Sequence, residues 1–419
     1  MSLRVTLFIC MGVMALFLWL SSGTMVPYAV TTTNPVSIGE CNYLGNPDHA
    51  HFEAIYRFLQ SDAKNGWTDN LLLRRILLPL ISYPFFKKFG FMTGGFIANL
   101  LTLLLSVVLF YRFMRTRLDE SELKYVLMML ATYPGIYYWS SLPYSYAFIV
   151  PGCLLGYTLL TKIGESENII KIAASSLAMG ILFLGYDLFP FFLTAVASIL
   201  LRKKYYLKIP MSVVLMLVPM FVWNYLILKL YYHVEIVNEN SGVYGMILKS
   251  YLHLSNIKEW MLLIFKSPFE FLRVYLFSSF VFIPILFGYV LVKISYEKIS
   301  LIDRAFLFCA LILFLFNHWA PAYEGWQMRG GYLARLYQPV FLSFIIIIAK
   351  FTSANARNVR KIQFVCAMNA LVVLGIWVHS PLSSQVYLNF YRHSNRDPNN
   401  LWMNLEKYGK RPLGICKHD

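Results

Sequence analysis

Charged residues are scarce in this chain. They make up 14% of its 419 residues, and hydrophobic residues make up 58%, whereas a soluble domain averages roughly 25% charged residues. Many apolar runs approach the ~20 residues that a helix needs to cross hydrocarbon. The composition therefore predicts an all-α, polytopic membrane protein rather than a soluble domain.

Several motifs of soluble and energy-coupled enzymes are also missing. The sequence has no Walker A motif, no glycine-rich dinucleotide loop and no nucleophile elbow, which disfavours ATP-driven transport on this chain alone. The apolar runs hold few charges, which disfavours an ion-coupled carrier or a channel. No internal repeat is visible, which disfavours the transporters that are built from repeats.

Acidic residues are the scarcer charge, because 21 Asp and Glu stand against 37 Lys and Arg and give a net charge of +16. No basic patch lies in a soluble segment with a recognisable nucleic-acid-binding module, so we do not expect nucleic-acid binding. The basic residues gather instead in short loops between apolar runs, as the positive-inside rule describes. This pattern predicts the N-terminus inside, the C-terminus outside and an odd number of spans, about eleven.

The expected spans follow from the apolar runs. They lie at about 5–20, 91–114, 125–139, 146–161, 172–186, 188–201, 210–231, 271–292, 305–319, 336–349 and 362–378. A secretory signal peptide is the alternative reading of the first run, but no convincing small-residue cleavage site follows it, so we expect a retained span. The chain 1–419 is then one transmembrane domain, with outer segments at 21–90 and 232–270 and an outer tail at 380–419.

Cysteine is rare outside the apolar runs. Four of the six cysteines fall inside expected spans, where cysteine behaves as a small apolar residue; these are Cys10, Cys153, Cys309 and Cys366. Only Cys41 and Cys416 fall in outer segments, where the oxidising compartment permits a disulfide. A Cys41–Cys416 disulfide and two free thiols both remain open, because sequence does not fix the distance between the Cα atoms.

The most polar stretch of the chain, 40–79, lies in the first outer segment. Asn46 suits a helix N-cap, Pro47 the first helical position and Asp48 the first turn. Apolar residues then recur at helical spacing and predict an amphipathic helix that lies in the membrane interface; they are Phe52, Ile55, Tyr56 and Leu59. The Asp48 carboxylate either complements the helix dipole or acts as a general base that faces a membrane-embedded pocket.

Metal binding is a second reading of the same helix. Asp48 and His51 share one helical face, and His49 and Glu53 share another. Two ligands on a face are not a complete site, so we assign no metal ligands here. Dependence on a divalent cation stays open.

Further polar residues stand beside other expected spans. Arg74 and Arg75 either clamp a phosphate or snorkel toward lipid headgroups. Asp187, between two spans, is either a solvated turn acid or a functional residue. In and beside the outer turn 320–335, the candidate phosphate and sugar ligands are His318, Glu324, Arg329 and Arg335.

These features together resemble the GT-C superfamily of integral-membrane glycosyltransferases. Asp48, Phe52 and Ile55 are similar to the family's Asp-x-x-x-(aromatic)-x-x-(Ile/Ala) pattern, and Arg-Ile-Leu-Leu-Pro-Leu at 75–80 resembles a segment of bacterial members. Two more segments are similar, at 140–146 and 329–339. The family's usual Asp-x-Asp or Glu-x-Asp pair is missing around Asp48. This leaves open whether Asp48, Glu53, Asp187 or Glu324 is the base and whether a metal is needed.

The resemblance implies inverting transfer of a hexose or pentose from a polyprenyl-phosphate donor to a glycan, lipid or protein acceptor. Asp48 would be the general base. The charge on the departing phosphate would be offset by Arg74, Arg75, Arg329 and Arg335, and further substrate contacts would come from Tyr144, His318 and Glu324.

The resemblance also implies a location and leaves two rivals. We expect a multi-pass protein of a bacterial inner membrane, with a periplasmic active site that serves cell-envelope glycan biosynthesis and contacts membrane lipids. The rivals are a glycan polymerase or ligase of the O-antigen type and a non-enzymatic transporter of lipids or solutes.

Overall fold

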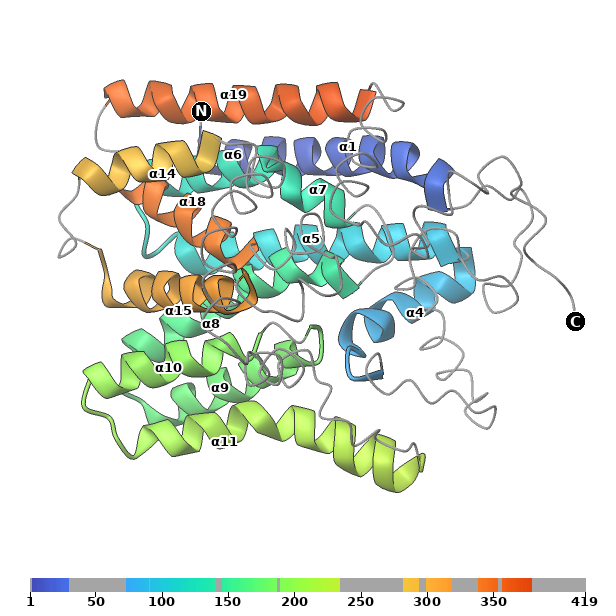
Figure 1. Ribbon diagram of the computed structural model, residues 1–419, viewed down its shortest axis with the longest axis vertical. Helices are drawn as coiled ribbons and strands as arrows, with labels where there is room; N and C mark the ends of the chain where they lie inside the picture. Colours follow the sequence, from blue (N-terminus) through green and yellow to red (C-terminus); the bar gives the residue numbers. More distant parts are fainter. Residues whose placement is uncertain are drawn as a thin grey trace, which may run out of the picture.

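The computed structural model describes residues 2–29, 73–89, 91–140, 145–186, 189–233, 282–293, 299–318, 338–352 and 356–378. Within these ranges every regular element is a helix (Figure 1). The helices are α1 (Leu3–Ala29), α4 (Leu77–Phe89), α5 (Phe91–Met114), α6 (Glu120–Thr132), α7 (Pro134–Ser140), η1 (Ser145–Phe148), α8 (Ile149–Glu165), α9 (Ile169–Phe183), α10 (Phe191–Arg202), α11 (Lys208–Phe221), η2 (Val222–Tyr231), α14 (Phe282–Lys293), α15 (Leu301–His318), α18 (Gln338–Thr352) and α19 (Ala356–Val378). The predicted all-α class is confirmed for this part of the chain.

Three helical stretches are long and apolar enough to cross a membrane. They are Leu3–Leu20, Gly94–Met114 and Lys208–Tyr231, and they fall where the first, second and seventh spans are predicted. A described helix also overlaps each of the other eight predicted segments, and three of these are shorter apolar helices, at Ile169–Phe183, Phe191–Arg202 and Gln338–Phe351. The chain is therefore a helical membrane protein, and about eleven crossings remains a prediction.

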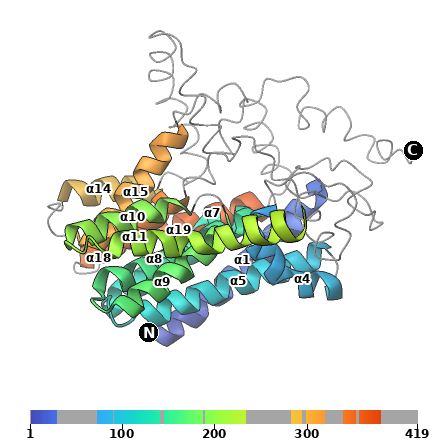
Figure 2. The same ribbon diagram turned by 90° about the horizontal axis from the view of Figure 1, so that it is seen from below.

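The long helices α1, α5 and α11 lie roughly parallel to one another in both ribbon views (Figures 1 and 2). Helix α8 packs against α5, α9, α10, α15 and α18, and most of its side chains are buried. A helix that is apolar on all sides occupies the interior of a bundle. Helix α8 is thus the centre around which the other helices pack.

The predicted third span, 125–139, is divided into two helices. Proline has no N–H and disfavours helical backbone at the residue before it, and Tyr133, which precedes Pro134, is extended with φ −74° and ψ 111°. The Tyr137 hydroxyl donates a hydrogen bond to the Ala131 carbonyl next to this break. This hydrogen bond gives a partner to a carbonyl near the end of α6. It therefore stabilises the interruption between α6 and α7 inside the bundle.

Glycines let the helices of this bundle approach closely. A Cβ at Gly152 of α8 would lie 2.2 Å from the ring of Phe189, and a Cβ at Gly156 would lie 2.3 Å from the ring of Phe192. Small residues at such spacing are typical of helix contacts in membranes, where close packing replaces the hydrophobic effect.

Gly180 makes the tightest backbone contact between α9 and α11, and replacing it by alanine is expected to destabilise the protein. The added Cβ would lie 2.3 Å from the carbonyl oxygen of Met216, and a backbone atom cannot turn away as a side chain can. We expect a loss of about 1–3 kcal/mol in the free energy of unfolding. Gly12→Ala is the matched control, because a Cβ there meets nothing within 4 Å. Equal stability of both variants in detergent-induced unfolding would contradict the close contact.

Candidate functional site

Arg74 and Arg75 lie in a short segment, 73–76, that leads into α4. The backbone N–H of Leu77 donates to the carbonyl of Leu184 (3.0 Å), and the indole Nε1 of Trp223 donates to the carbonyl of Leu73 (2.7 Å). Leu73 and Ile76 also form a small apolar cluster with side chains of η2 and the α9–α10 turn. The segment is therefore held between η2 and the turn that follows α9.

Arg75 is buried in this position. Its side chain is 4% exposed, and its guanidinium carbon lies 4.5 Å from the centre of the Tyr186 ring. Such a cation–π contact offsets part of the cost of burying the charge. The two alternatives for this pair of arginines, a phosphate clamp and snorkelling to the headgroups, both stay predictions. Arg74 is half-buried.

The α9–α10 turn also meets η1. A Cβ at Gly185 would lie 2.1 Å from the ring of Phe148, and the rings of Phe148 and Phe189 make an edge-to-face contact at 5.8 Å. The sequence singled out Arg75, Asp187 and Tyr144 separately. Tyr186, which precedes Asp187, contacts Arg75. Helix η1, which begins at Ser145 directly after Tyr144, contacts α4.

Most of the other predicted site residues fall outside the described residues. These are Cys41, Asp48, Glu53, Tyr144, Asp187, Glu324, Arg329, Arg335 and Cys416. His318 ends α15, and its side chain is likewise not described. Among the described residues no group of three or more His, Cys, Asp or Glu side chains is placed to hold a metal ion. The roles assigned to these positions stay predictions.

The four remaining cysteines lie within described helices. Each is a free, buried thiol, which confirms their predicted place in the apolar interior.

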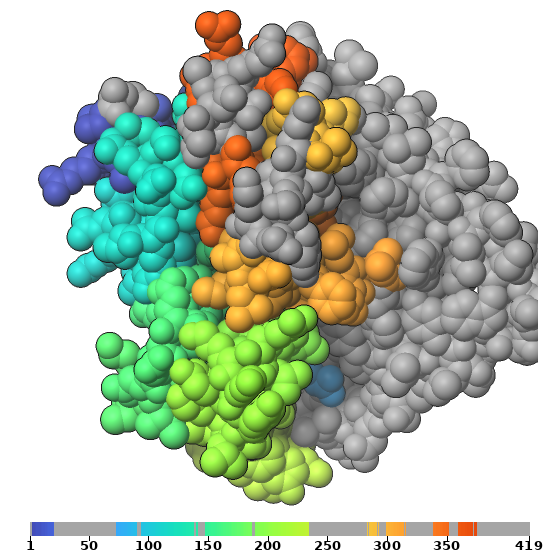
Figure 3. Space-filling model, turned by 90° about the vertical axis from the view of Figure 1, so that its left-hand side faces the viewer, coloured from blue at the N-terminus to red at the C-terminus, as the bar shows by residue number. Residues whose placement is uncertain are grey.

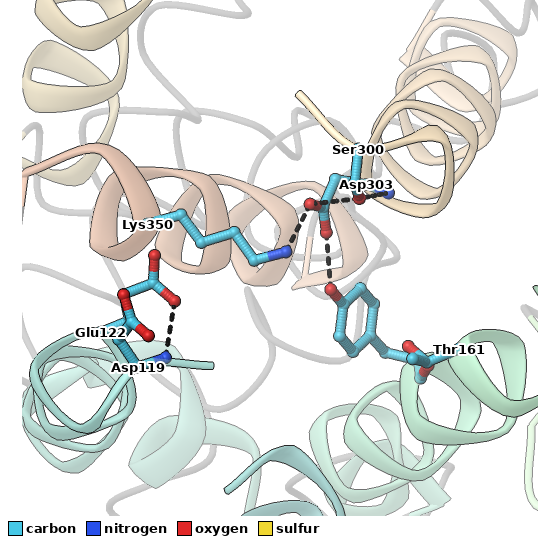
Figure 4. Close-up of polar contacts among 7 residues, drawn as sticks. Asp119, Glu122, Thr161, Ser300, Asp303 and Lys350 are labelled. Carbon is cyan, nitrogen blue, oxygen red and sulfur yellow. Dashed lines mark hydrogen bonds and ion pairs between the residues drawn. The ribbon is translucent and has the colours of Figure 1, made fainter. Parts of the chain in front are cut away.

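A second polar cluster joins the middle of α8, the start of α15 and the end of α18, and it was not predicted (Figure 4). The Asp303 carboxylate, 2% exposed, accepts a hydrogen bond from the Tyr157 hydroxyl (2.5 Å). Its other oxygen accepts from the Ser300 hydroxyl (2.6 Å) and pairs with the Lys350 ammonium (2.5 Å). The Ser300 hydroxyl in turn accepts from the Asp303 backbone N–H (3.2 Å).

This arrangement makes Asp303 a structural anchor. A buried carboxylate is costly unless it is paired and hydrogen-bonded, and three donors surround this one. Two signals were present in the sequence: Ser300 and Asp303 have capping-box spacing at a helix start, and Lys350 ends the neighbouring span. Asp303 and Lys350 are 47 positions apart in the chain. The sequence alone does not show that their helices bring the carboxylate and the ammonium together.

Glu122 lies on the other side of Lys350 in Figure 4. Its carboxylate accepts a hydrogen bond from the Asp119 backbone N–H (3.0 Å) and completes a capping box at the start of α6. Burial raises the pKa of the Glu122 carboxyl, and the positive charge of Lys350 opposes this shift. Lys350 thus stands between two carboxylates and connects α6 electrostatically to the Asp303 cluster.

The geometry offers a buried cation, Arg75, in segment 73–76 and a buried ion pair, Asp303 and Lys350, elsewhere in the bundle. The buried arginine suits the binding of an anionic ligand, and the ion pair stabilises the packing of the helices. A comparison with models of known protein families finds no match, and a comparison with curated proteins finds none either.

Proposed function

We propose that this protein is an inverting membrane glycosyltransferase of the GT-C kind. It moves a sugar from a polyprenyl-phosphate donor to a glycan, lipid or protein acceptor on the outer face of a bacterial inner membrane. The observation that carries the proposal is the burial of Arg75 where segment 73–76 meets the α9–α10 turn.

Arg75 suits the phosphate of such a donor. The side chain is almost fully buried and lies against an aromatic ring, so its charge is screened less than an exposed charge would be. A guanidinium presents donors in its plane that match phosphate oxygens. Half-buried Arg74 beside it adds a second positive charge at the same place.

The chemistry of the proposed reaction is a displacement at the anomeric carbon of the sugar. Asp48 takes the proton of the acceptor hydroxyl, and the hydroxyl oxygen forms a bond to the anomeric carbon from the side opposite the phosphate. The bond between that carbon and the phosphate oxygen breaks, and polyprenyl phosphate leaves with the electron pair. Positive charge stabilises the leaving group, and this is the role proposed for Arg74, Arg75, Arg329 and Arg335.

The size and position of the first outer segment favour this function over its rivals. Segment 21–90 follows the first span directly, whereas a polymerase or ligase of the O-antigen type would rely on arginines and a histidine in large outer loops elsewhere. A transporter would place polar residues along its spans.

The products of a labelled reaction test the proposal. Purified protein in proteoliposomes would receive radiolabelled polyprenyl-phosphate sugars together with membrane lipids and extracted glycans. We expect one labelled sugar on an acceptor for each polyprenyl phosphate released. Labelled chains of many units would indicate a polymerase, and movement of intact donor across the bilayer would indicate a transporter. No transfer from any donor would contradict the proposal.

A further inference from the structure

A turn rich in lysine joins α10 to α11 at the inner end of the bundle. We call residues 202–208 the lysine turn, because Arg202 ends α10, Lys208 begins α11, and Lys203 and Lys204 lie between them. Figure 3 views this end of the molecule, where the surfaces of α8–α9 (green) and α10–α11 (lime) adjoin. Positive charge on inner loops sets orientation in general, but three features of this turn go beyond that role.

The first feature is a pair of lysines that share one aromatic ring. The ammonium of Lys208 lies 3.8 Å from the centre of the Tyr205 ring, and the ammonium of Lys203 lies 5.8 Å from it. Lys208 also donates to the Glu167 carbonyl (2.8 Å). The two charges are within about 10 Å of each other, close to the Debye length of about 8 Å, so their potentials add and attract an anion.

The second feature is a lysine where the backbone favours glycine. Lys204 has φ 60°, and the Tyr205 N–H donates to the Leu200 carbonyl (2.9 Å) while the Lys204 N–H donates to Leu201 (2.9 Å). This is a helix C-terminus with its left-handed residue at 204, a position that glycine usually fills. A side chain there costs stability, and this position presents an exposed lysine in the turn.

The third feature is the absence of acidic partners. Lys204 and Arg202 are exposed and make no ion pair with any residue in the described ranges, and the same holds for Lys171 on α9 nearby. Of the described acids just before α9, Glu165 pairs with Arg117 (2.6 Å) and Glu167 is exposed. Within the described ranges, Arg202, Lys204 and Lys171 therefore have no paired carboxylate.

Apolar side chains project beside these charges. Tyr206 is 60% exposed and Leu207 is 89% exposed within the same turn, and Ile169 and Ile170 are 53% and 73% exposed at the start of α9. Helices α9 and α11 pack against each other. Cations next to exposed apolar groups at a helix end match the boundary between lipid phosphates and acyl chains.

We infer that the lysine turn binds the headgroups of anionic phospholipids in the inner leaflet. The phosphate lies at the ammonium groups around Tyr205, and the acyl chains contact Leu207 and the two isoleucines. A soluble phosphate ester would use the charges but not the apolar groups. This inference does not depend on the glycosyltransferase proposal, because the outer site plays no part in it.

Lipid titration of the purified protein tests the inference. Native mass spectrometry in detergent would follow binding of phosphatidylglycerol and of phosphatidylcholine to the wild type and to Lys203→Gln/Lys204→Gln/Lys208→Gln. Each lysine near a membrane surface contributes about fivefold in affinity. We expect the triple variant to bind phosphatidylglycerol roughly a hundredfold more weakly and phosphatidylcholine unchanged.

The matched control removes three other lysines that stack on aromatic rings, Lys87, Lys88 and Lys229. These belong to α4 and η2 at the opposite end of the bundle, and their triple glutamine variant should keep the preference for phosphatidylglycerol. A triple arginine variant of the lysine turn should keep it too, which separates charge from folding. The inference would be overturned if the glutamine variant of the lysine turn kept the wild-type preference for phosphatidylglycerol. It would also be overturned if inorganic phosphate displaced the bound lipid as effectively as free phosphatidylglycerol does.

Discussion

Asp303→Ala is expected to lower the free energy of unfolding by about 3–5 kcal/mol, because it leaves the Lys350 ammonium unpaired inside the protein. The side chains of Asp303 and Lys350 are 2% and 20% exposed, so water compensates little of the loss. The Tyr157 and Ser300 hydroxyls lose their acceptor at the same time. Unfolding in mixed micelles of increasing dodecyl sulfate content, followed by circular dichroism, measures the change.

The double variant Asp303→Ala/Lys350→Met distinguishes a buried pair from two independent contacts. If the loss comes from an uncompensated charge, removing the ammonium as well should recover part of the stability. The pair of Lys124 and Glu120 (2.7 Å) on α6 is the matched control, because its carboxylate is 60% exposed, against 2% for Asp303. Lys124→Met should change stability little, since pairs with a solvated partner contribute little. Equal losses at Lys124 and Asp303 would contradict the anchoring role of the cluster.

Asp48→Asn is expected to reduce sugar transfer about 100- to 10,000-fold, the usual contribution of a general base. Asparagine keeps the shape of Asp48 and suits the predicted first turn of its helix, but it cannot take the proton of the acceptor. Donor binding should stay within about twofold of the wild type, because the base does not contact the phosphate. Initial rates with labelled donor at saturating acceptor give the comparison.

Two matched variants identify the base. Glu53→Gln and Asp187→Asn carry the same kind of change at two of the other candidate acids, and each should retain most of the transfer activity. Full activity in Asp48→Asn together with a large loss in one of the others would move the assignment to that residue. A normal rate in all three would contradict general-base catalysis by any of them.

The helices were predictable from sequence where one physical effect decides the outcome. Helix α5 has the predicted bounds of the second span, and its only charged residue is Arg112 in the last turn. Such a long apolar run has no alternative to a helix in hydrocarbon. The predicted third span was divided at Pro134, a signal that was present in the sequence and outweighed by the apolar run. Helix α1 continues to Ala29, beyond the predicted end of its span at 20, since apolar length does not fix where a helix ends outside hydrocarbon.

The site was predictable only as a set of residue types. Arg75 stood out because a charge beside apolar residues needs an explanation, but its contact with Tyr186 depends on how distant segments pack. The Trp223–Leu73 hydrogen bond that holds the segment joins residues 150 positions apart. Asp303 was missed for the same reason, since its partners lie on three different elements.

Binding of polyprenyl phosphate to the wild type and to Arg75→Gln tests most directly whether Arg75 holds the donor phosphate. Removal of a charged donor to phosphate should weaken binding about 10- to 100-fold, while thermal unfolding confirms that the variant is folded. Lys87→Gln removes an exposed charge from adjacent α4 and should leave the affinity unchanged. Equal affinity of the wild type and Arg75→Gln for polyprenyl phosphate would contradict the account.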